Sequence, residues 1–244
     1  MLEQVASPAK RSDPELSCAT ETYLKAVLEL EEVGADPIRS RVADRLGHAV
    51  PTVSITVGRM AKRGLLDVGD ADRRLRLTPE GQHVAVRVIR WHRLAECFLH
   101  DELGLPWERV HDEASRWEQA FSWESAERLD RRLGHPTRTP YGTSIPSADE
   151  RRWASFPGPI DALSLTEAVL AGDSSPTASL RLSWIGEGAQ AAPGLLASFA
   201  QAGLAPGARL SAELERDGVV IRAESGGGEL TVPHAVAAQL FVTE

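Results

Sequence analysis

The chain of 244 residues is poor in cysteine and contains no long hydrophobic run. Its two cysteines, Cys18 and Cys97, form no CxxC pair, which argues against a disulfide framework or a cysteine-rich zinc module and fits a reducing compartment. No stretch approaches the roughly 20 apolar residues that a membrane-spanning helix needs. The N-terminus, MLEQVASPAKRSDPELS, lacks the apolar segment of a signal peptide. We therefore expect a soluble, cytoplasmic protein without a membrane partner.

The net charge of the whole chain is −8, and this total by itself argues against binding to nucleic acid. The charge is unevenly distributed, however. The segment from Pro37 to Arg93 holds eleven arginines and one lysine against five acidic residues, so it carries +7 and the rest of the chain −15. Because charges are screened within about 8 Å at physiological salt, local charge decides the attraction to phosphate. A basic segment on an acidic body is compatible with DNA binding.

The N-terminal third of the chain shows helical periodicity in three successive segments. Residues 19–34, 37–47 and 51–64 each place apolar side chains on one face, and each segment ends at a glycine. The following run, residues 65–81, alternates apolar and polar positions around GDADR, which indicates a β-hairpin. This order of elements is that of a winged helix-turn-helix, in which the third helix enters the major groove and the hairpin lies along the DNA backbone.

The exposed side of the third predicted helix carries small hydroxyl side chains that can reach phosphates and base edges, and arginines continue onto the wing. The residues expected to contact double-stranded DNA are Arg39, Thr52, Ser54, Thr56, Arg59, Arg73 and Arg74. The alternative is a helical core with a solvated basic face. Order, spacing and charge agree on DNA binding, whereas any one of them alone would be a weak indication.

The rest of the chain changes character twice. Residues 79–135 again show helical periodicity, with one long amphipathic helix expected to end near Gly104 and two more to follow. The next stretch, residues 135–160, is rich in Pro, Ser, Thr and Gly, which is typical of a loop or linker. From about Ser164, short strand-like runs alternate with glycine-rich turns, and this pattern indicates a small β-barrel of the SH3-like kind.

Several stretches of residues 19–146 also occur in a characteristic order and spacing. They are TETYLKAVLELEE, PIRSRVADRLGHAVPTVSITVGRM, LTPEGQ, RWHRLAECFL, VHDEASRWEQAFSWESAERL and RTPYGTSIP. On these residues the chain resembles the diphtheria toxin repressor family of metal-dependent transcriptional regulators, the iron- and manganese-dependent repressors. A weaker similarity extends over the C-terminal strands.

The resemblance implies three folded domains and a fold that is mainly α with α+β parts. We expect a disordered N-terminal tail (1–18), a winged helix-turn-helix DNA-binding domain (19–90), a helical dimerisation and metal-binding domain (91–146), a linker (147–163) and an SH3-like β-barrel domain (164–244).

The resemblance also implies a divalent-metal site called ancillary, which uses the His and Glu of an HRLAE motif and the His of an HDEA motif. Here these ligands are His92, Glu96 and His111. His92 and Glu96 are four residues apart on one helix, so their side chains can converge on one ion. Imidazole with carboxylate suits Mn²⁺, Fe²⁺, Co²⁺ or Zn²⁺. Without the family, a His followed by a Glu on a helix is more often surface decoration.

At the family's other metal site, called primary, this chain departs from the pattern. The family uses a Met or an acid, a Cys or Glu, a Glu and a His, whereas the matching residues here are Thr22, Ser115, Glu118 and Gln119. Only Glu118 keeps the expected chemistry. Glu118 and Gln119 remain candidate ligands for hard ions, and the expected affinity for transition metals is weak. Cys18, one helical turn before Thr22, is expected to be an inert thiol.

Two further parts of the family pattern are altered. An ungapped match puts Ala192 and Leu195 where the third domain supplies a Glu and a Gln as ligands, and Glu187 and Gln190 can substitute for them if the loop shifts. A small anion site in the family uses an Arg with a Ser and an Asn. The matching residues here are Arg93, Thr139 and Thr143, which keep an anion contact feasible. Alternatively, the two threonines only cap turns.

These features predict a homodimeric, divalent-metal-responsive repressor of metal-homeostasis genes that binds a palindromic operator. Mn²⁺ is our first choice and Fe²⁺ the second, because the candidate ligands lack sulfur, with Zn²⁺ or Co²⁺ as substitutes in vitro. The dimer is expected to form through residues 113–133, and its apolar candidates are Trp117, Phe121, Trp123 and Leu129. The runner-up is a member of the same family with degenerate metal control that answers another signal or binds DNA constitutively. A metalloenzyme is a remote alternative, because no substrate or phosphate motif accompanies the ligands.

Overall fold

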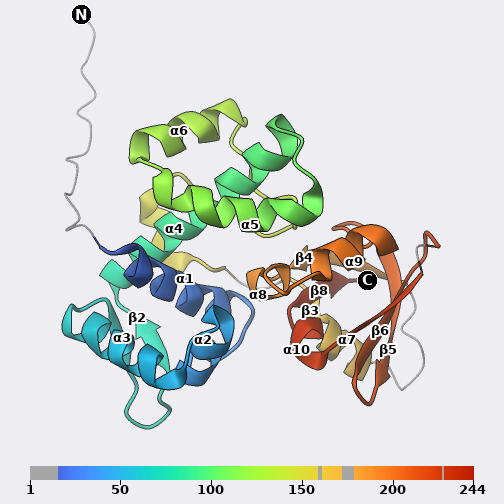
Figure 1. The fold of residues 1–244 in the computed structure, drawn as a ribbon, viewed down its shortest axis with the longest axis horizontal. Coiled ribbons are helices and arrows are strands. Elements are labelled where there is room, and N and C mark those ends of the chain that lie inside the picture. Colours follow the sequence, from blue (N-terminus) through green and yellow to red (C-terminus); the bar gives the residue numbers. More distant parts are fainter. Residues whose placement is uncertain (1–15, 159–160, 172–178, 227) are drawn as a thin grey trace, which may run out of the picture.

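The computed structural model describes residues 16–158, 161–171, 179–226 and 228–244. Figure 1 shows three parts: a unit of helices α1 to α3 with a small hairpin, a helical unit built on α4, α5 and α6, and a C-terminal sheet domain. Of the tail expected to be disordered (1–18), residues 1–15 lie outside the described residues. In the described part of the chain, no helix has the length and apolar character needed to cross a membrane.

The N-terminal unit has the predicted winged helix-turn-helix architecture. Ser17 caps the first helix by accepting a hydrogen bond from the backbone N–H of Thr20, and Gly47 ends the second in the left-handed conformation. In the wing, Leu66 pairs with Leu77 across two antiparallel strands. The elements are α1 (Cys18–Glu32), α2 (Arg39–Leu46), α3 (Val50–Lys62), β1 (Leu66–Val68) and β2 (Leu75–Leu77).

The long helix α4 (Pro79–Cys97) belongs to both N-terminal units. Thr78 caps it, and nearly every side chain from Val84 onwards is buried, because α1 packs on one side and α5 on another. The predicted domain boundary at residues 90–91 falls inside this helix. The α-helix that was expected to run to Gly104 ends at Cys97, and the chain continues from there as a π-helical turn. The following elements are η1 (Phe98–Glu102), α5 (Trp107–Trp117), η2 (Glu118–Ala120) and α6 (Trp123–Arg132).

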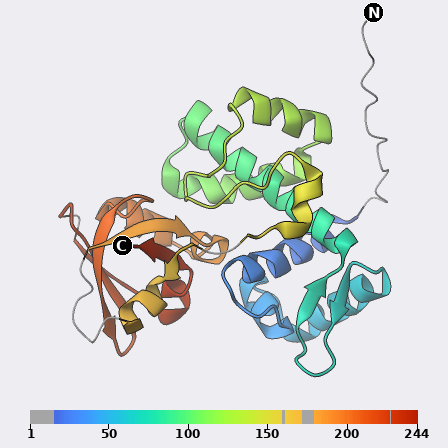
Figure 2. The same ribbon diagram turned by 180° about the vertical axis from the view of Figure 1, so that it is seen from behind.

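The predicted linker at 147–163 is more ordered than its composition indicates. It contains a short 3-10 helix, η3 (Glu150–Ser155), whose Trp153 is buried in the core of the N-terminal unit. Trp153 stacks on Trp123 with ring centroids 5.9 Å apart, and its indole N–H donates to the carbonyl of Ser147. One large aromatic side chain therefore holds η3 against the helices, and in the view from behind in Figure 2 this short helix lies in front of them.

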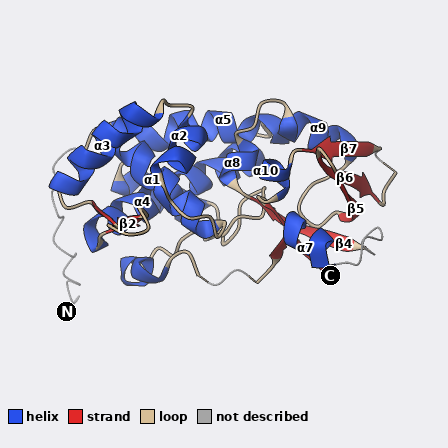
Figure 3. Ribbon diagram, turned by 90° about the horizontal axis from the view of Figure 1, so that it is seen from below, coloured by secondary structure: helices blue, strands red, loops and turns tan. Residues whose placement is uncertain are grey.

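The C-terminal domain is a six-stranded antiparallel sheet with strand order β3-β8-β4-β5-β6-β7. Its end strands, β3 and β7, are not paired with each other in the described residues, so the SH3-like sheet is not a closed barrel. Figure 3 shows strands confined to this domain and the wing. Its strands are β3 (Leu163–Ser164), β4 (Leu180–Ile185), β5 (Arg209–Glu215), β6 (Gly218–Ala223), β7 (Glu229–Val232) and β8 (Leu240–Thr243).

The described residues of this domain also form four short helices, which the strand pattern of the sequence did not predict. They are α7 (Leu165–Ala171), α8 (Glu187–Gln190), α9 (Leu195–Ala202) and α10 (His234–Ala237). Helix α9 packs on α5, so the sheet domain and the helical domain share one hydrophobic core. This packing brings α8 beside α4 and α1, where several charged side chains are buried together.

Candidate metal centre and DNA-binding face

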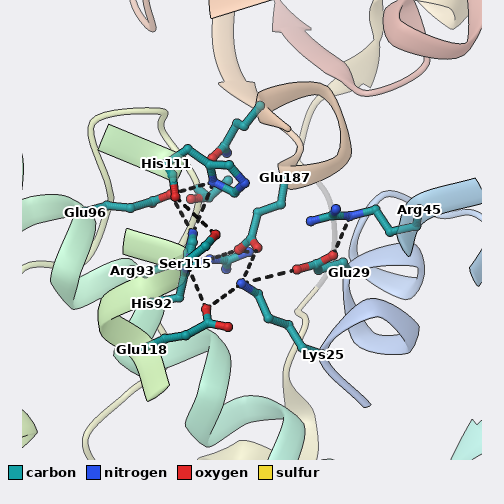
Figure 4. A network of polar contacts seen from close by, with 12 residues as sticks. Lys25, Glu29, Arg45, His92, Arg93, Glu96, His111, Ser115, Glu118 and Glu187 are labelled. Atoms are coloured by element: carbon teal, nitrogen blue, oxygen red, sulfur yellow. Dashed lines mark hydrogen bonds and ion pairs between the residues drawn. The ribbon is translucent and has the colours of Figure 1, made fainter. Parts of the chain in front are cut away.

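Three predicted metal ligands converge in the interior of the protein. His92 and Glu96 come from consecutive turns of α4, and His111 comes from the facing side of α5. The Nε2 atom of His92 lies 2.9 Å from Oε1 of Glu96 and 3.2 Å from Nδ1 of His111, and the same Glu96 oxygen lies 3.2 Å from Nδ1 of His111. All three side chains are buried. Figure 4 shows them pointing toward one another.

The chemistry of this cluster fits a divalent cation. One donor atom from each residue lies within 4.8 Å of the others, close enough to share one ion. Glu96 Oε2 is buried and has no hydrogen-bond partner, and neither has Oε1 of Gln190, the last residue of α8. Buried acceptors without partners are costly, so such atoms mark places where a ligand or ion completes the structure. Two imidazoles with a carboxylate suit a first-row transition metal.

The charge state of the cluster depends on its carboxylates. Burial and the Lys25 ammonium lower the pKa of His92, but the carboxylates of Glu96, Glu187 and Glu118 outweigh them and raise it to about 9. Burial lowers the pKa of His111, so this imidazole is neutral at pH 7. Without a metal ion, His92 therefore holds a proton at neutral pH, and a metal that binds its Nε2 atom must displace that proton.

Glu118 is not one of the three converging ligands, but it contacts one of them, His92. Its Oε2 atom lies 2.8 Å from Nδ1 of His92, on the side of the ring opposite the cluster. A carboxylate in this position fixes the orientation of a metal-binding imidazole and strengthens it as a donor. Gln119, the other predicted ligand, is exposed, and its amide nitrogen lies 3.4 Å from Oε1 of Glu118. The structure thus separates Glu118 and Gln119 from the three converging ligands.

A second group of buried charges surrounds Lys25 of α1. Its ammonium lies 2.8 Å from Glu118 Oε2, 3.3 Å from Glu187 Oε2 and 3.7 Å from Glu29 Oε1, and Arg45 of α2 holds the other oxygen of Glu29 at 2.7 Å. Burial lowers the pKa of Lys25, but these carboxylates outweigh it and raise the pKa above its usual value. The sequence reasoning missed Lys25. Its only sequence signal is its place on the inner face of α1, one turn after Thr22.

The residues of the altered primary site line one surface cavity together with Lys25. The Thr22 hydroxyl donates to the Cys18 carbonyl and the Ser115 hydroxyl to the His111 carbonyl, each within its own helix. Cys18 is exposed at the start of α1. These residues present neutral oxygens and one carboxylate, which is already paired with Lys25, so they do not fit a divalent ion as they stand.

The two candidate ligands of the third domain, Glu187 and Gln190, lie together on one short helix. Glu187 and Gln190 are both buried on α8, whereas Ala192 and Leu195 follow that helix. Glu187 accepts from Nε of Arg93 at 3.0 Å and reaches Lys25 with its other oxygen. Helix α8 thus carries two buried acceptor side chains of the third domain. Their role as metal ligands stays a prediction.

The predicted anion site looks different in the structure. Arg93 is completely buried, and its guanidinium bonds to both oxygens of Glu32, to Glu187 and to the Ser144 carbonyl. These carboxylates already supply the negative charge that an anion would bring. The hydroxyls of Thr139 and Thr143 bond to each other at 2.8 Å, and Thr139 accepts from the N–H of Tyr141, as a turn cap does. The anion site therefore remains a prediction, and the turn-capping alternative accounts for the contacts of both threonines.

The residues predicted to contact DNA lie on the unit formed by α2, α3 and the wing. Thr52, Arg59 and Arg73 are exposed, and Ser54, Thr56 and Arg39 are half-buried. Arg59 and Arg73 have no carboxylate partner among the described residues. Arg74 is exposed as well but forms an ion pair with Asp36. Ile55, which the sequence reasoning missed, exposes 59% of its surface between these hydroxyls. An exposed Ile in a recognition helix can contact a thymine methyl group.

The apolar candidates for the dimer seam are half-buried in the single chain. Trp117 and Phe121 pack against the core shared with the sheet domain, and Trp123 packs on the N-terminal core. Leu129 contacts a third, small cluster with Leu94 and Cys97. Part of each side chain is therefore core of the monomer. Their place in a dimer seam stays a prediction.

Comparison with known protein families finds two matches that together span most of the N-terminal two-thirds of the chain. Residues 15–71 match the family described as iron dependent repressor, N-terminal DNA binding domain. Residues 78–147 match iron dependent repressor, metal binding and dimerisation domain. The two matches fall on the winged-helix unit and on α4 to α6.

Individual proteins show the same similarity. The chain is 42% identical over 225 residues to the iron-dependent repressor IdeR of Mycobacterium tuberculosis, which covers 91% of this chain and 96% of that protein. It is 49% identical over 131 residues to the diphtheria toxin repressor of Corynebacterium diphtheriae, or 54% of this chain and 58% of that one. A solved manganese-dependent transcriptional repressor in complex with manganese has a TM-score of 0.71 and 30% identity, covering 92% of this chain and 99% of that one. With its fold, its donor cluster and these similarities, the chain belongs to the diphtheria toxin repressor family of iron-dependent repressors.

Proposed function

We propose that this chain is a homodimeric transcriptional repressor that binds DNA in response to a divalent metal ion held by His92, Glu96 and His111. The observation that carries the proposal is that these three buried donors converge on one point. Two of them come from α4, which also packs on α1 of the DNA-binding unit. The family consists of transcriptional repressors, so the prediction that the chain is not an enzyme is confirmed and the metalloenzyme alternative falls away.

The position of the cluster supports a coupling between metal and DNA. His92 and Glu96 project from the same helix whose other face packs on α1, and Glu187 of α8 in the third domain contacts Arg93 of that helix and Lys25 of α1. A bound ion supplies a double positive charge among these carboxylates and replaces the proton of His92. It can favour DNA binding only to the extent that it binds the DNA-competent arrangement more tightly than the others.

The relatives bear on the identity of the metal. The relative that is 42% identical is named an iron-dependent repressor, which favours Fe²⁺, whereas the donor set led us to prefer Mn²⁺. Structural neighbours are named for manganese. Imidazole, carboxylate and amide donors accept both ions. We propose that Fe²⁺ and Mn²⁺ both bind this site, and that their relative availability decides which one activates the protein.

The DNA-binding surface that we propose comprises α3 and the wing, with a palindromic operator that matches a two-fold symmetric dimer. The free arginines Arg59 and Arg73 would contact phosphates, and Thr52, Ser54, Thr56 and Ile55 would face the groove. Two such units in a dimer would lie about one helical turn of DNA, or a multiple of it, apart. The distribution of free basic side chains on this face supports the assignment.

The decisive experiment measures DNA affinity with and without metal. Operator sequences are selected from a random duplex library with the protein loaded anaerobically with Fe²⁺ or with Mn²⁺, and affinity is then measured by fluorescence anisotropy. We expect metal to strengthen binding in the wild type and to have little effect in His92→Ala. His100→Ala removes an exposed histidine of η1 and serves as the matched control. Equal affinity with and without metal in the wild type would favour the runner-up, a repressor that has lost metal control.

A further inference from the structure

The group of charges around Lys25 stands at the altered primary site, where the family pattern puts a second metal ion. Lys25 is only 4% exposed, and it lies on α1 one turn after Thr22, the residue that replaces the first family ligand. Its ammonium contacts Glu118, which is the one family ligand that remains. A positive charge that is part of the chain therefore already occupies the neighbourhood of that carboxylate.

The contacts of the ammonium come from all three parts of the protein. Glu29 belongs to α1 in the DNA-binding unit, Glu118 to η2 in the helical unit, and Glu187 to α8 in the sheet domain. Figure 4 shows Lys25 reaching from its helix to the point where the other two carboxylates meet. A metal ion would link the same parts by binding ligands from each of them. The covalently tethered ammonium makes this link without any ligand from solution.

A divalent cation and this ammonium exclude each other. Two cations within a few ångströms repel strongly in a buried site, where water screens charges poorly. The Glu118 oxygen that faces Lys25 also faces His92, so it has no free lone pair directed at a further ion. The remaining residues of the altered site, Thr22, Ser115 and Gln119, are neutral and cannot displace the ammonium.

We propose that Lys25 takes the place of the second metal ion of the family, so that α1 is tied permanently to the helical and third domains. The metal response of this chain then comes from a single site per chain. The inference rests on the proposed function only in what it says about regulation. The number of ions at the His92, Glu96 and His111 site and at the altered primary site is measured separately.

The test counts bound Mn²⁺ per chain by equilibrium dialysis and elemental analysis. We expect one ion in the wild type, and two in Lys25→Ala, where Glu29, Glu118 and Glu187 are left as an oxygen-rich site of the kind that hard cations prefer. Lys62→Ala removes an exposed lysine of α3 and should keep one ion. The additional variant Lys25→Ala/His92→Ala should keep the ion at the new site and lose the other.

A second set of variants keeps the proposal testable even if Lys25→Ala does not fold. The triple variant Thr22→Met/Ser115→Cys/Gln119→His restores the family's ligand types while Lys25 stays in place. We expect it to bind one ion, because the ammonium still occupies the site, and to bind two only when Lys25→Ala is added. Two ions in the triple variant, or a second ion in the wild type that Glu118→Gln removes, would overturn the proposal. If His92→Ala has no effect on the count while Lys25→Ala still adds one ion, the proposed function fails and this inference stands.

Discussion

Two clusters of buried charge lie side by side in this protein, and Glu118 contacts both of them. In one, His92, Glu96 and His111 point donor atoms at a common point, and an oxygen of Glu96 has no partner. In the other, the carboxylates close on Lys25, a cation that belongs to the chain. The first cluster leaves a carboxylate oxygen without any donor, whereas each carboxylate of the second has an ion-pair contact with Lys25, and Glu29 Oε1 and Glu187 Oε2 form no hydrogen bond beyond that contact.

The difference shows how one family scaffold can keep one metal site and dispense with another. Both sites need a positive charge among carboxylates, because several buried negative charges without a counter-charge are costly. A metal ion and a lysine both supply that charge, but only the metal can leave. Replacing an ion with a lysine therefore preserves the mechanical link and removes the response to concentration.

Removing the built-in cation should destabilise the protein more than any other change considered. Lys25→Ala removes the ammonium from Glu118 and Glu187, which keep only His92 and Arg93 as cationic partners, so we expect a loss of about 3 kcal/mol in the free energy of unfolding, the lower end of the range for breaking a buried ion pair. The measurement is urea unfolding with a chelator present, which prevents a metal ion from replacing the lysine. Lys62→Ala, an exposed change, should stay within about 0.5 kcal/mol of the wild type. If both variants unfold alike, the second cluster is not held together by Lys25.

Removing one donor of the first cluster should impair metal binding more than removing Glu118. We expect His92→Ala to lower Mn²⁺ affinity by more than about 100-fold, and Glu118→Gln, which only supports His92 from behind, by about 10–100-fold. Calorimetric titration of both variants measures the two affinities. The reverse order, with Glu118→Gln abolishing binding and His92→Ala leaving it intact, would show that the altered primary site still senses metal.

Metal affinity should rise with pH across the neutral range. The pKa of His92 is raised to about 9, so the metal-free protein holds a proton on this imidazole below that pH, and binding must release it. With one proton released, affinity increases about tenfold per pH unit up to about pH 9, where the gain stops. Titrations at pH 6.5, 7.5 and 8.5 measure the slope. Glu118→Gln removes one carboxylate that favours the proton, so its slope should level off at lower pH.

The smallest effect should come from the third domain. Gln190 has a buried oxygen without a partner, while its amide nitrogen donates to the Ile185 carbonyl at 2.6 Å. If this oxygen completes the first cluster, Gln190→Ala should lower Mn²⁺ affinity by about tenfold or less, the weaker end of the range for supporting residues. Gln82→Ala, whose amide bonds to the carbonyl of Trp153 on the far side of α4, is the control. Equal affinities in both variants would mean that Gln190 adds no ligand to the cluster of His92, Glu96 and His111.

Short segments of the sequence were enough to predict the helices of the N-terminal unit, its wing and the cluster of His92, Glu96 and His111. Apolar spacing and terminal glycines are properties of short segments, so they located α1, α2, α3 and the wing, and alternation located the strands of the sheet domain. The four-residue spacing of His92 and Glu96 put two donors on one face of a helix, and the family resemblance added His111. The same local patterns did not show the short helix η3, because one aromatic contact of Trp153 with distant residues holds it in place.

Only the tertiary structure decided which charges are paired. Lys25 looks like an ordinary helical lysine in the sequence, since its partners Glu118 and Glu187 are 93 and 162 positions further along the chain. That Glu187 and Gln190 are buried on α8 also depends on where this helix packs. A buried charge is tolerated only where opposite charges converge on it, and that convergence is set by the packing of α1, η2 and α8, which no local pattern encodes.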